Sequence, residues 1–157
     1  RNAYKLHACN GILFNHESER RGLEFVTRKI TDGVARIKCG QTDVLELGDL
    51  SPRRDWGFAA DYTRGMIEML LQDEPRDYVL ASGSDRSVED FVRAAFACVD
   101  LDWQEHVRQT PKLFRKNELP CLQGDASTAR EILGWEPSLS FEGLVERMVA
   151  ADLERVS

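Results

Sequence analysis

Residues 7–37 read HACNGILFNHESERRGLEFVTRKITDGVARI, and their pattern decides the class of fold. The run from His7 to Phe14 is short and mostly apolar without clear alternation, which is typical of a strand buried on both faces of a parallel sheet. A polar stretch that ends at Gly22 follows. Apolar residues then recur at 26, 30, 34 and 37, which is a helical spacing. The order strand, polar loop, helix predicts an α/β fold.

The rest of the chain continues this mixed pattern. Strands are predicted at 42–47 and 77–82, and helices from near residue 58 to the 73–76 segment, over 87–99, over 128–134 and from 141 onwards. Ser87 and Asp90 form a capping-box pattern before the clearest of these helices. An apolar stripe on the helix from residue 58, expected to pack in the core, comprises Tyr62, Met66, Met69 and Leu70. Helices outnumber strands in this prediction.

The composition indicates a globular protein and excludes some classes of partner. The chain has 157 residues, which suits one domain, and its 42% hydrophobic residues and five prolines favour a packed core over disorder. Its 21 basic and 27 acidic side chains give a formal charge of −6, so no basic field would draw it to nucleic acid or to an anionic membrane. An anionic ligand would need local arginines.

The four cysteines and the hydropathy of the chain bear on the compartment in which we expect the protein to occur. The cysteines show neither CxxC spacing nor the Cys and His spacing that a zinc or haem motif requires, so we expect buried reduced thiols and no metal site. No apolar run approaches the roughly 20 residues of a membrane span, and the first residues lack the architecture of a signal peptide. We therefore expect a soluble, cytoplasmic protein.

Several extended segments carry a family resemblance. The run CNGILFNHESERRG at 9–22 closely resembles a segment of the GDP-mannose 4,6-dehydratases, which are extended short-chain dehydrogenase-like enzymes that bind NADP. FVTRKI at 25–30, RDWGFAADY at 54–62 and GDASTAREILGW at 124–135 continue the resemblance in the family's order. It covers essentially the whole chain, and NHES together with RDWG disfavours a GDP-sugar reductase or epimerase.

The resemblance implies the carboxy-terminal half of an extended Rossmann-like fold. Residues 1–22 would be the last strands and the loop bordering the dinucleotide-binding domain, and residues 23–157 the substrate-binding lobe. The sequence holds no GxxGxxG loop after a strand and no suitably placed Tyr-x-x-x-Lys pair. The family's catalytic Tyr, Lys, Thr and Glu would lie upstream of Arg1, so no catalytic residue is assigned in this chain.

The resemblance also implies an activity for the intact enzyme. It would convert GDP-D-mannose to GDP-4-dehydro-6-deoxy-D-mannose, in GDP-fucose biosynthesis, as a homo-oligomer. NADP would take a hydride from C4 and return it at C6 after water is eliminated, so the net reaction is that of a lyase. These 157 residues alone are expected to be inactive. The alternative is a non-catalytic nucleotide-sugar-binding or assembly module derived from such an enzyme.

Three residues of the NHES segment match family positions near the ligands. His16 and Arg21 match positions that contact NADP, where a guanidinium neutralises phosphate and an imidazole donates to a ribose or phosphate oxygen. Asn15 is expected to contact the nucleotide sugar, because its amide both donates and accepts hydrogen bonds. The alternatives are a solvated polar loop for His16 and Arg21 and a loop cap for Asn15.

Two arginines are expected on the diphosphate of GDP-mannose. Arg54, in the RDW segment, and Arg115 together offer two guanidinium groups that meet a dianion bidentately. The alternative for Arg54 is a surface ion pair with Asp55 or Asp61.

Two further residues are candidates for the nucleoside. Glu118 matches a family carboxylate that accepts both ribose hydroxyls, and Lys29 is a candidate for the guanine or its ribose. The alternative for Lys29 is a helical lysine that faces water. The sequence departs from the family pattern at Glu19, Phe58, Lys116 and Asn117.

Overall fold

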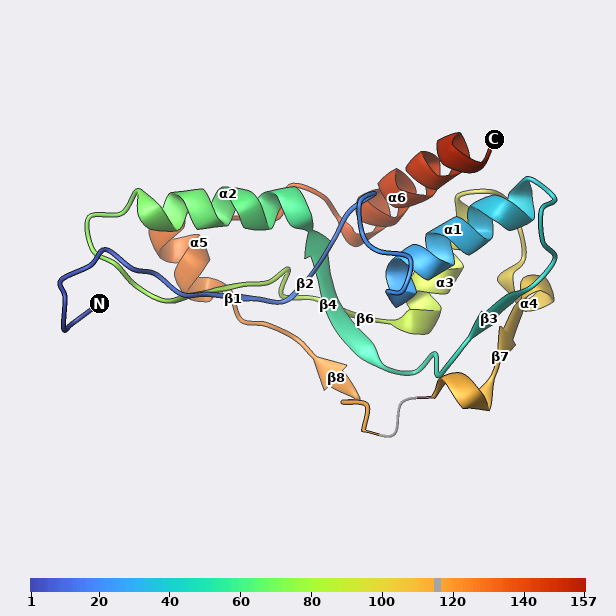
Figure 1. Ribbon diagram of the computed structural model, residues 1–157, viewed down its shortest axis with the longest axis horizontal. Coiled ribbons are helices and arrows are strands. Elements are labelled where there is room, and N and C mark those ends of the chain that lie inside the picture. Colours follow the sequence, from blue (N-terminus) through green and yellow to red (C-terminus); the bar gives the residue numbers. More distant parts are fainter. Residues whose placement is uncertain (115–116) are drawn as a thin grey trace.

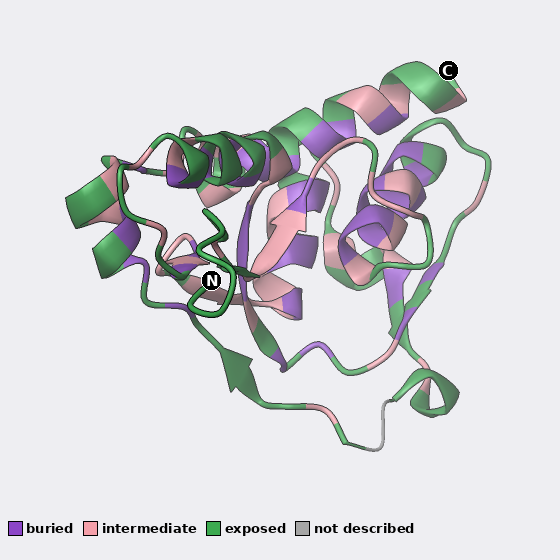
Figure 2. Cartoon of the chain, turned by 60° about the vertical axis from the view of Figure 1, so that its left-hand side comes forward, coloured by how far each residue is buried: buried purple, intermediate pink, exposed green. Residues whose placement is uncertain are grey.

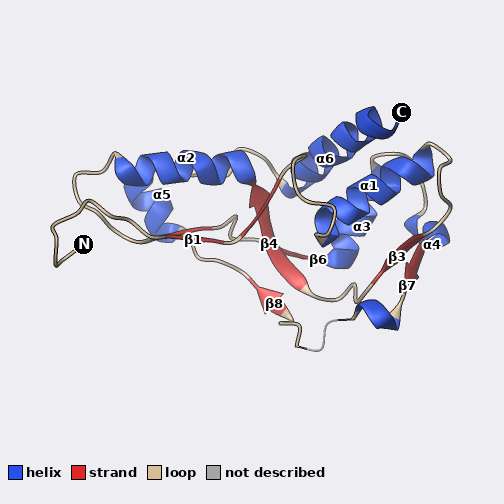
Figure 3. Cartoon of the chain, in the orientation of Figure 1, coloured by secondary structure: helices blue, strands red, loops and turns tan. Residues whose placement is uncertain are grey.

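A computed structural model of the chain describes residues 1–114 and 117–157. Their elements are drawn in Figures 1 and 3. In chain order they are β1 (Gly11–Leu13), β2 (Asn15–Glu17), α1 (Val26–Lys38), β3 (Leu45–Leu47), β4 (Arg53–Phe58), α2 (Ala59–Leu70), β5 (Tyr78–Leu80), β6 (Asp85–Ser87), α3 (Val88–Ala97), α4 (Trp103–His106), β7 (Val107–Gln109), the 3-10 helix η1 (Pro111–Leu113), β8 (Cys121–Leu122), α5 (Ser127–Leu133) and α6 (Phe141–Val156).

The apolar run at 7–14 contains one strand, and the polar residues directly after it form a second strand in another small sheet. The first strand, β1, pairs in parallel with β5, Gly11 opposite Tyr78, and the next strand β2 pairs in parallel with β4, Asn15 opposite Trp56. β4 also pairs with β6, antiparallel, and with β8, and a third small sheet joins β3 to β7. The long strand β4 therefore links the two ends of the molecule in Figure 1.

Each end of the molecule has its own apolar core. The larger core lies among α1, α3, α6 and the β3–β7 pair, with fully buried side chains such as Ile30, Phe91 and Val145. The smaller one lies between α2, α5 and the β1–β5 pair, around Tyr62 and Trp135. Figure 2 shows the buried residues turned inward on these helices, whereas the β8 segment is exposed. The predicted α/β class is confirmed.

Local sequence signals explain where the helices begin and end. The Ser87 hydroxyl accepts the Asp90 amide N–H at 3.0 Å and the Asp90 carboxylate accepts the Ser87 amide N–H at 2.9 Å, so the capping box at α3 is confirmed. At α6 the Ser140 hydroxyl accepts the Gly143 amide N–H at 3.1 Å, a single capping bond. α5 ends at Gly134, whose φ of +60° favours glycine.

The first strand and α2 are less buried than predicted. Ile12 is 55% exposed, because its side chain points to the face of the β1–β5 pair opposite Leu13, which packs against the smaller core. On α2, Tyr62 and Met69 are buried, but Met66 and Leu70 are 41% and 61% exposed, so the predicted core stripe is half wrong. The reason is that the inner side of α2 packs on a two-stranded sheet, and no part of the described chain covers the outer side of the helix.

The element count and the cysteines also differ from expectation. Helices hold more residues than strands, but the described strands are more numerous. Seven of the eight have three residues or fewer, which is too short for a periodic pattern. The cysteines are unpaired, yet Cys39, Cys98 and Cys121 are exposed rather than buried. Within residues 1–114 and 117–157, no helix combines the length and apolar character needed to cross a membrane.

Candidate functional site

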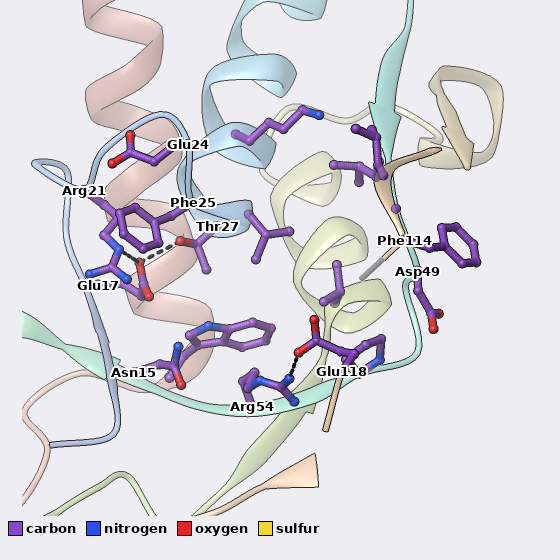
Figure 4. Close-up of a pocket in the computed structure, with 18 residues that line it drawn as sticks. Asn15, Glu17, Arg21, Glu24, Phe25, Thr27, Asp49, Arg54, Phe114 and Glu118 are labelled. Atoms are coloured by element: carbon purple, nitrogen blue, oxygen red, sulfur yellow. Dashed lines mark hydrogen bonds and ion pairs between the residues drawn. The ribbon is translucent and has the colours of Figure 1, made fainter. Parts of the chain in front are cut away.

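A cavity of about 360 Å³ lies where β2, the start of α1, β4 and the segment around residue 118 meet. Five of the seven predicted binding residues line it: Asn15, Arg21, Lys29, Arg54 and Glu118. The side chains of four of them are seen around it in Figure 4, together with Glu17, Phe25 and Thr27. Arg115 falls outside the described residues, and His16 is absent from the lining.

The alternation of β2 explains why Asn15 lines the cavity and His16 does not. Successive side chains of a strand point to opposite faces, so Asn15 and Glu17 share one face and His16 takes the other. The His16 ring lies 5.1 Å from the Tyr62 ring, centroid to centroid, and its Nδ1 lies 2.9 Å from the Phe14 carbonyl oxygen. The polar loop predicted for this segment is therefore wrong at residues 15–17, which form a strand whose alternation separates the two neighbours.

Glu17 is a buried carboxylate in the cavity wall, within the segment that was predicted as a polar loop. It is 2% exposed, its carboxylate accepts the Thr27 hydroxyl at 2.6 Å, and Arg21 Nε lies 3.3 Å away. Burial raises the pKa of Glu17, and the Thr27 hydrogen bond and the Arg21 charge oppose that shift. The alternation Asn15, Glu17 was the signal that could have placed it at the cavity.

Arg21 lies flat against an aromatic ring with donor capacity left over. Its guanidinium carbon is 3.5 Å from the centroid of the Phe25 ring, a cation–π arrangement. Its Nε is buried and, among the described residues, has no hydrogen-bond partner, although it lies 3.3 Å from a Glu17 carboxylate oxygen in an ion pair. A guanidinium held in this way is suited to an anionic oxygen of a ligand.

Arg54 and Glu118 are brought together by the fold. The Arg54 guanidinium forms an ion pair with the Glu118 carboxylate and donates to the Leu119 carbonyl oxygen at 2.8 Å, and the Arg54 side chain is only 12% exposed. The alternative pairing of Arg54 with its acidic neighbours is wrong. The Asp55 carboxylate accepts hydrogen bonds from the amide N–H groups of Ser82, Gly83 and Gly124. The Asp61 carboxylate forms an ion pair with Arg64 and accepts a hydrogen bond from the Ser138 amide N–H.

The charges around the cavity are mixed. Among the described lining residues, Arg21, Lys29 and Arg54 are cationic, and Glu17, Glu24, Asp49 and Glu118 are acidic. The backbone N–H of Ser51 lowers the pKa of Asp49. A dianion would therefore bind through individual guanidinium groups rather than through a positive field. In the part of the chain that is described, no group of His, Cys, Asp and Glu is arranged to hold a metal ion.

Comparison with known proteins identifies the family. The model of the family described as GDP-mannose 4,6 dehydratase matches residues 1–148. This chain belongs to that family. It is 52% identical over 154 residues to GDP-mannose 4,6 dehydratase 1 of Arabidopsis thaliana, covering 98% of this chain and 43% of that relative. With the Homo sapiens GDP-mannose 4,6 dehydratase, identity is 44% over 171 residues, covering 98% and 46%. The chain thus spans less than half the length of these relatives.

Solved structures show the fold. RMD from Pseudomonas aeruginosa, complexed with NADPH, superposes with a TM-score of 0.89 at 18% identity, over 98% of this chain and 51% of that one. DesIV, a dTDP-glucose 4,6-dehydratase from Streptomyces venezuelae with NAD and TYD bound, superposes with a TM-score of 0.81 at 21% identity, over 98% and 46%. The chain has the architecture of part of an extended Rossmann-like short-chain dehydrogenase fold.

Proposed function

We propose that this chain is the carboxy-terminal, nucleotide-sugar-binding half of a GDP-mannose 4,6-dehydratase. The term "intact enzyme" denotes the polypeptide that carries both this half and the dinucleotide-binding half. Residues 1–22 would border that half and residues 23–157 would form the substrate lobe. One observation carries the proposal: segments distant in sequence bring Asn15, Lys29, Arg54 and Glu118 to one cavity, of a size in the range of small-molecule sites.

Each lining residue has a proposed part in binding GDP-mannose. Arg54 and Arg115 would both donate to the diphosphate. Because the described lining holds more acidic than cationic residues, the charge of Arg115 would help to neutralise the dianion. Because Arg54 already pairs with Glu118, the ligand must share or replace that contact. Glu118 would accept the ribose hydroxyls, Lys29 would meet the guanine or its ribose, and Asn15 would hydrogen-bond the nucleotide sugar.

NADP is the proposed cofactor, and Arg21 offers the part of its site that the geometry fits best. The Nε of Arg21 is buried beside Glu17, so we propose that the terminal nitrogens of its guanidinium donate to a phosphate oxygen. His16 lies on the other face of β2, so it would contact the cofactor from a side that Arg21, which lines the cavity, does not share. When bound, NADP would supply hydride acceptance and return, and the residues of this chain would hold and orient the ligands. Homo-oligomeric assembly, a cytoplasmic location and a place in GDP-fucose biosynthesis stay predictions.

A turnover assay tests the proposal. The intact enzyme is incubated with NADP and GDP-mannose, and the product is analysed by mass spectrometry, with UDP-glucose and dTDP-glucose as parallel substrates. We expect a 4-keto product lighter than GDP-mannose by one water, and little or none from the other two sugars. Equal turnover of the uridine or thymidine sugars, or none of GDP-mannose, would contradict the proposal.

A further inference from the structure

Arg28, in the first turns of α1, is a buried arginine outside the cavity. The residue is 6% exposed, and its Nε and one terminal nitrogen donate to both carboxylate oxygens of Asp152 at 2.7–3.0 Å. The other terminal nitrogen donates to two backbone carbonyl oxygens, of Glu19 at 3.0 Å and of Arg21 at 2.7 Å. One guanidinium therefore joins α6 to the loop that carries Arg21.

Asp152 holds Arg28 from the opposite helix. It is fully buried in α6. Its carboxylate also accepts a hydrogen bond from the Thr31 hydroxyl at 2.6 Å and forms an ion pair with Arg155. With these partners the orientation of the carboxylate is fixed by two elements, and the plane of the Arg28 guanidinium is fixed with it.

The two carbonyl contacts set the path of the loop between β2 and α1. The loop also has local turns, from the Arg21 amide N–H to the Ser18 carbonyl oxygen at 3.0 Å and from Phe25 to Gly22 at 3.1 Å. Those bonds fix only short stretches. Arg28 ties the Arg21 carbonyl to α1 and, through Asp152, to α6, while Arg155 of α6 also donates to the Glu19 carbonyl oxygen at 3.4 Å. From that anchor the Arg21 side chain reaches across Phe25 into the cavity.

We propose that Arg28, held by Asp152 of α6, is a positioning residue for Arg21, so that a helix remote from the cavity controls ligand binding there. The inference rests on the proposed function in taking Arg21 as a ligand contact. Stability alone is a poor reason for the arrangement, because buried ion pairs often contribute little net stability compared with apolar residues of similar volume. The geometry of two carbonyls met by one planar guanidinium requires arginine, and lysine would not reproduce it.

A double-mutant cycle in the intact enzyme tests the coupling. Arg28→Lys keeps the charge opposite Asp152 but loses the fork, and it is combined with Arg21→Ala. Thr31→Val, which keeps both charged partners and removes only the hydroxyl on Asp152, is the milder variant if Arg28→Lys folds poorly. Ser140→Ala is the matched control, because it weakens α6 at its far end without touching the loop. Dissociation constants for NADPH, by fluorescence, and for GDP, by calorimetry, are measured well below each unfolding midpoint.

We expect Arg28→Lys to weaken binding of NADPH or GDP by about fivefold or more when Arg21 is present and by less than about twofold when Arg21 is alanine. Thr31→Val should act in the same direction more weakly, and Ser140→Ala should lower the unfolding midpoint with affinity unchanged. Equal losses in both backgrounds, a loss in Ser140→Ala that matches Arg28→Lys, or no loss at all would overturn the inference. The Arg21→Ala variant alone shows which ligand Arg21 binds, and turnover of GDP-mannose by the unaltered enzyme judges the proposed function separately.

Discussion

At the scale of single residues, Arg54 carries most of the substrate assignment. Its guanidinium is nearly buried, faces the cavity and pairs with Glu118, whereas its neighbour Arg53 is more exposed and pairs with Asp85 on the other side of β4. Two adjacent arginines thus differ in the face of the strand that they occupy. This difference supplies a test with an internal control.

Arg54→Ala in the intact enzyme should weaken GDP-mannose binding by about 1.5 to 3 kcal/mol, the range for hydrogen bonds to charged groups, with NADP binding nearly unchanged. The same loss is expected for Arg115→Ala. Arg53→Ala, which removes an equal charge outside the cavity, should leave GDP-mannose affinity unchanged. Calorimetric titration measures all three. Unchanged affinity in Arg54→Ala would return this arginine to the role of an ion-pair partner for Glu118.

The neighbouring residues Asn15 and Arg21 are proposed to meet different ligands although they line one cavity. Arg21→Ala should lower retention of NADP, because a phosphate loses a charged partner, and Asn15→Ala should mainly raise the KM for GDP-mannose, because a neutral hydrogen bond is worth about 0.5 to 1.5 kcal/mol. Bound NADP is measured by absorbance after gel filtration, and kinetics follow with NADP restored. If Arg21→Ala keeps its NADP, or Asn15→Ala loses it, the two assignments are wrong.

At the scale of elements, the loop after β2 has a surface tether to α6 as well as the buried one. Glu19, where the family commonly has proline, forms a two-bond ion pair with Arg147 at 3.0 and 3.1 Å. The Arg147 hydrogen bonds lower the pKa of Glu19 to about 2 from its ordinary 4.5. In this chain an ion pair therefore restrains the loop at a position where the family commonly has a rigid proline ring.

The Glu19–Arg147 pair should make a pH-dependent contribution to stability. A carboxylate whose folded pKa is lowered stabilises the fold fully above its unfolded pKa, near 4.5, and that contribution is lost as the pH falls toward about 2. A double-mutant cycle with Glu19→Gln and Arg147→Ala, followed by urea unfolding at low salt, should show a small favourable coupling at pH 7. It should shrink below pH 4.5 and in high salt, because the pair is exposed. A coupling independent of pH would contradict this account.

The elements with strong periodicity were predictable from the sequence, and the shortest ones were not. The α3 helix shows both a capping box and an apolar stripe, so its position follows from local physics alone. β8 has two residues and β6 has three, too few for any alternation, and their pairing with β4 is a product of tertiary contacts. The exposure of Met66 was not predictable, because helical spacing defines a face but not what covers it.

The residues of the candidate site were predictable from the sequence, and the contacts between them were not. The family resemblance named Asn15, Lys29, Arg54 and Glu118, and the fold brings them together. The pairing of Arg54 with Glu118 joins residues 64 positions apart, which no local pattern encodes. The hydrogen bond from Arg28 to Asp152 joins residues 124 positions apart, and it likewise could not be predicted from any local pattern.

At the scale of the whole molecule, the chain has two small apolar cores and a partly uncovered end. Ile67 and Leu70 on α2, Leu71 directly after it and Ile12 on β1 are 55% to 70% exposed. Among the described residues, β1 pairs with one strand. Exposed apolar surface of this kind favours association. We expect the purified 157-residue chain to self-associate at concentrations where the intact enzyme forms a defined oligomer, as measured by light scattering. A monodisperse monomer would count against this view.

The same 157 residues should show no turnover of GDP-mannose when NADP is added. They hold no glycine-rich dinucleotide loop and no Tyr-x-x-x-Lys pair, so neither the cofactor nor the acid and base chemistry would be complete. Mass spectrometry for the 4-keto product, against a buffer control, measures this. Turnover above that control would show that this chain carries chemistry assigned to the other half.

A crystal structure of the intact enzyme with GDP and NADP bound would test the central claim most directly. We predict the diphosphate of GDP in the cavity, within hydrogen-bond distance of the Arg54 guanidinium, with the Arg54–Glu118 ion pair shared or replaced and with Asn15 on the sugar side. GDP bound elsewhere, with Arg54 still paired only to Glu118 and the cavity holding no nucleotide, would contradict the assignment of this cavity as the nucleotide-sugar site.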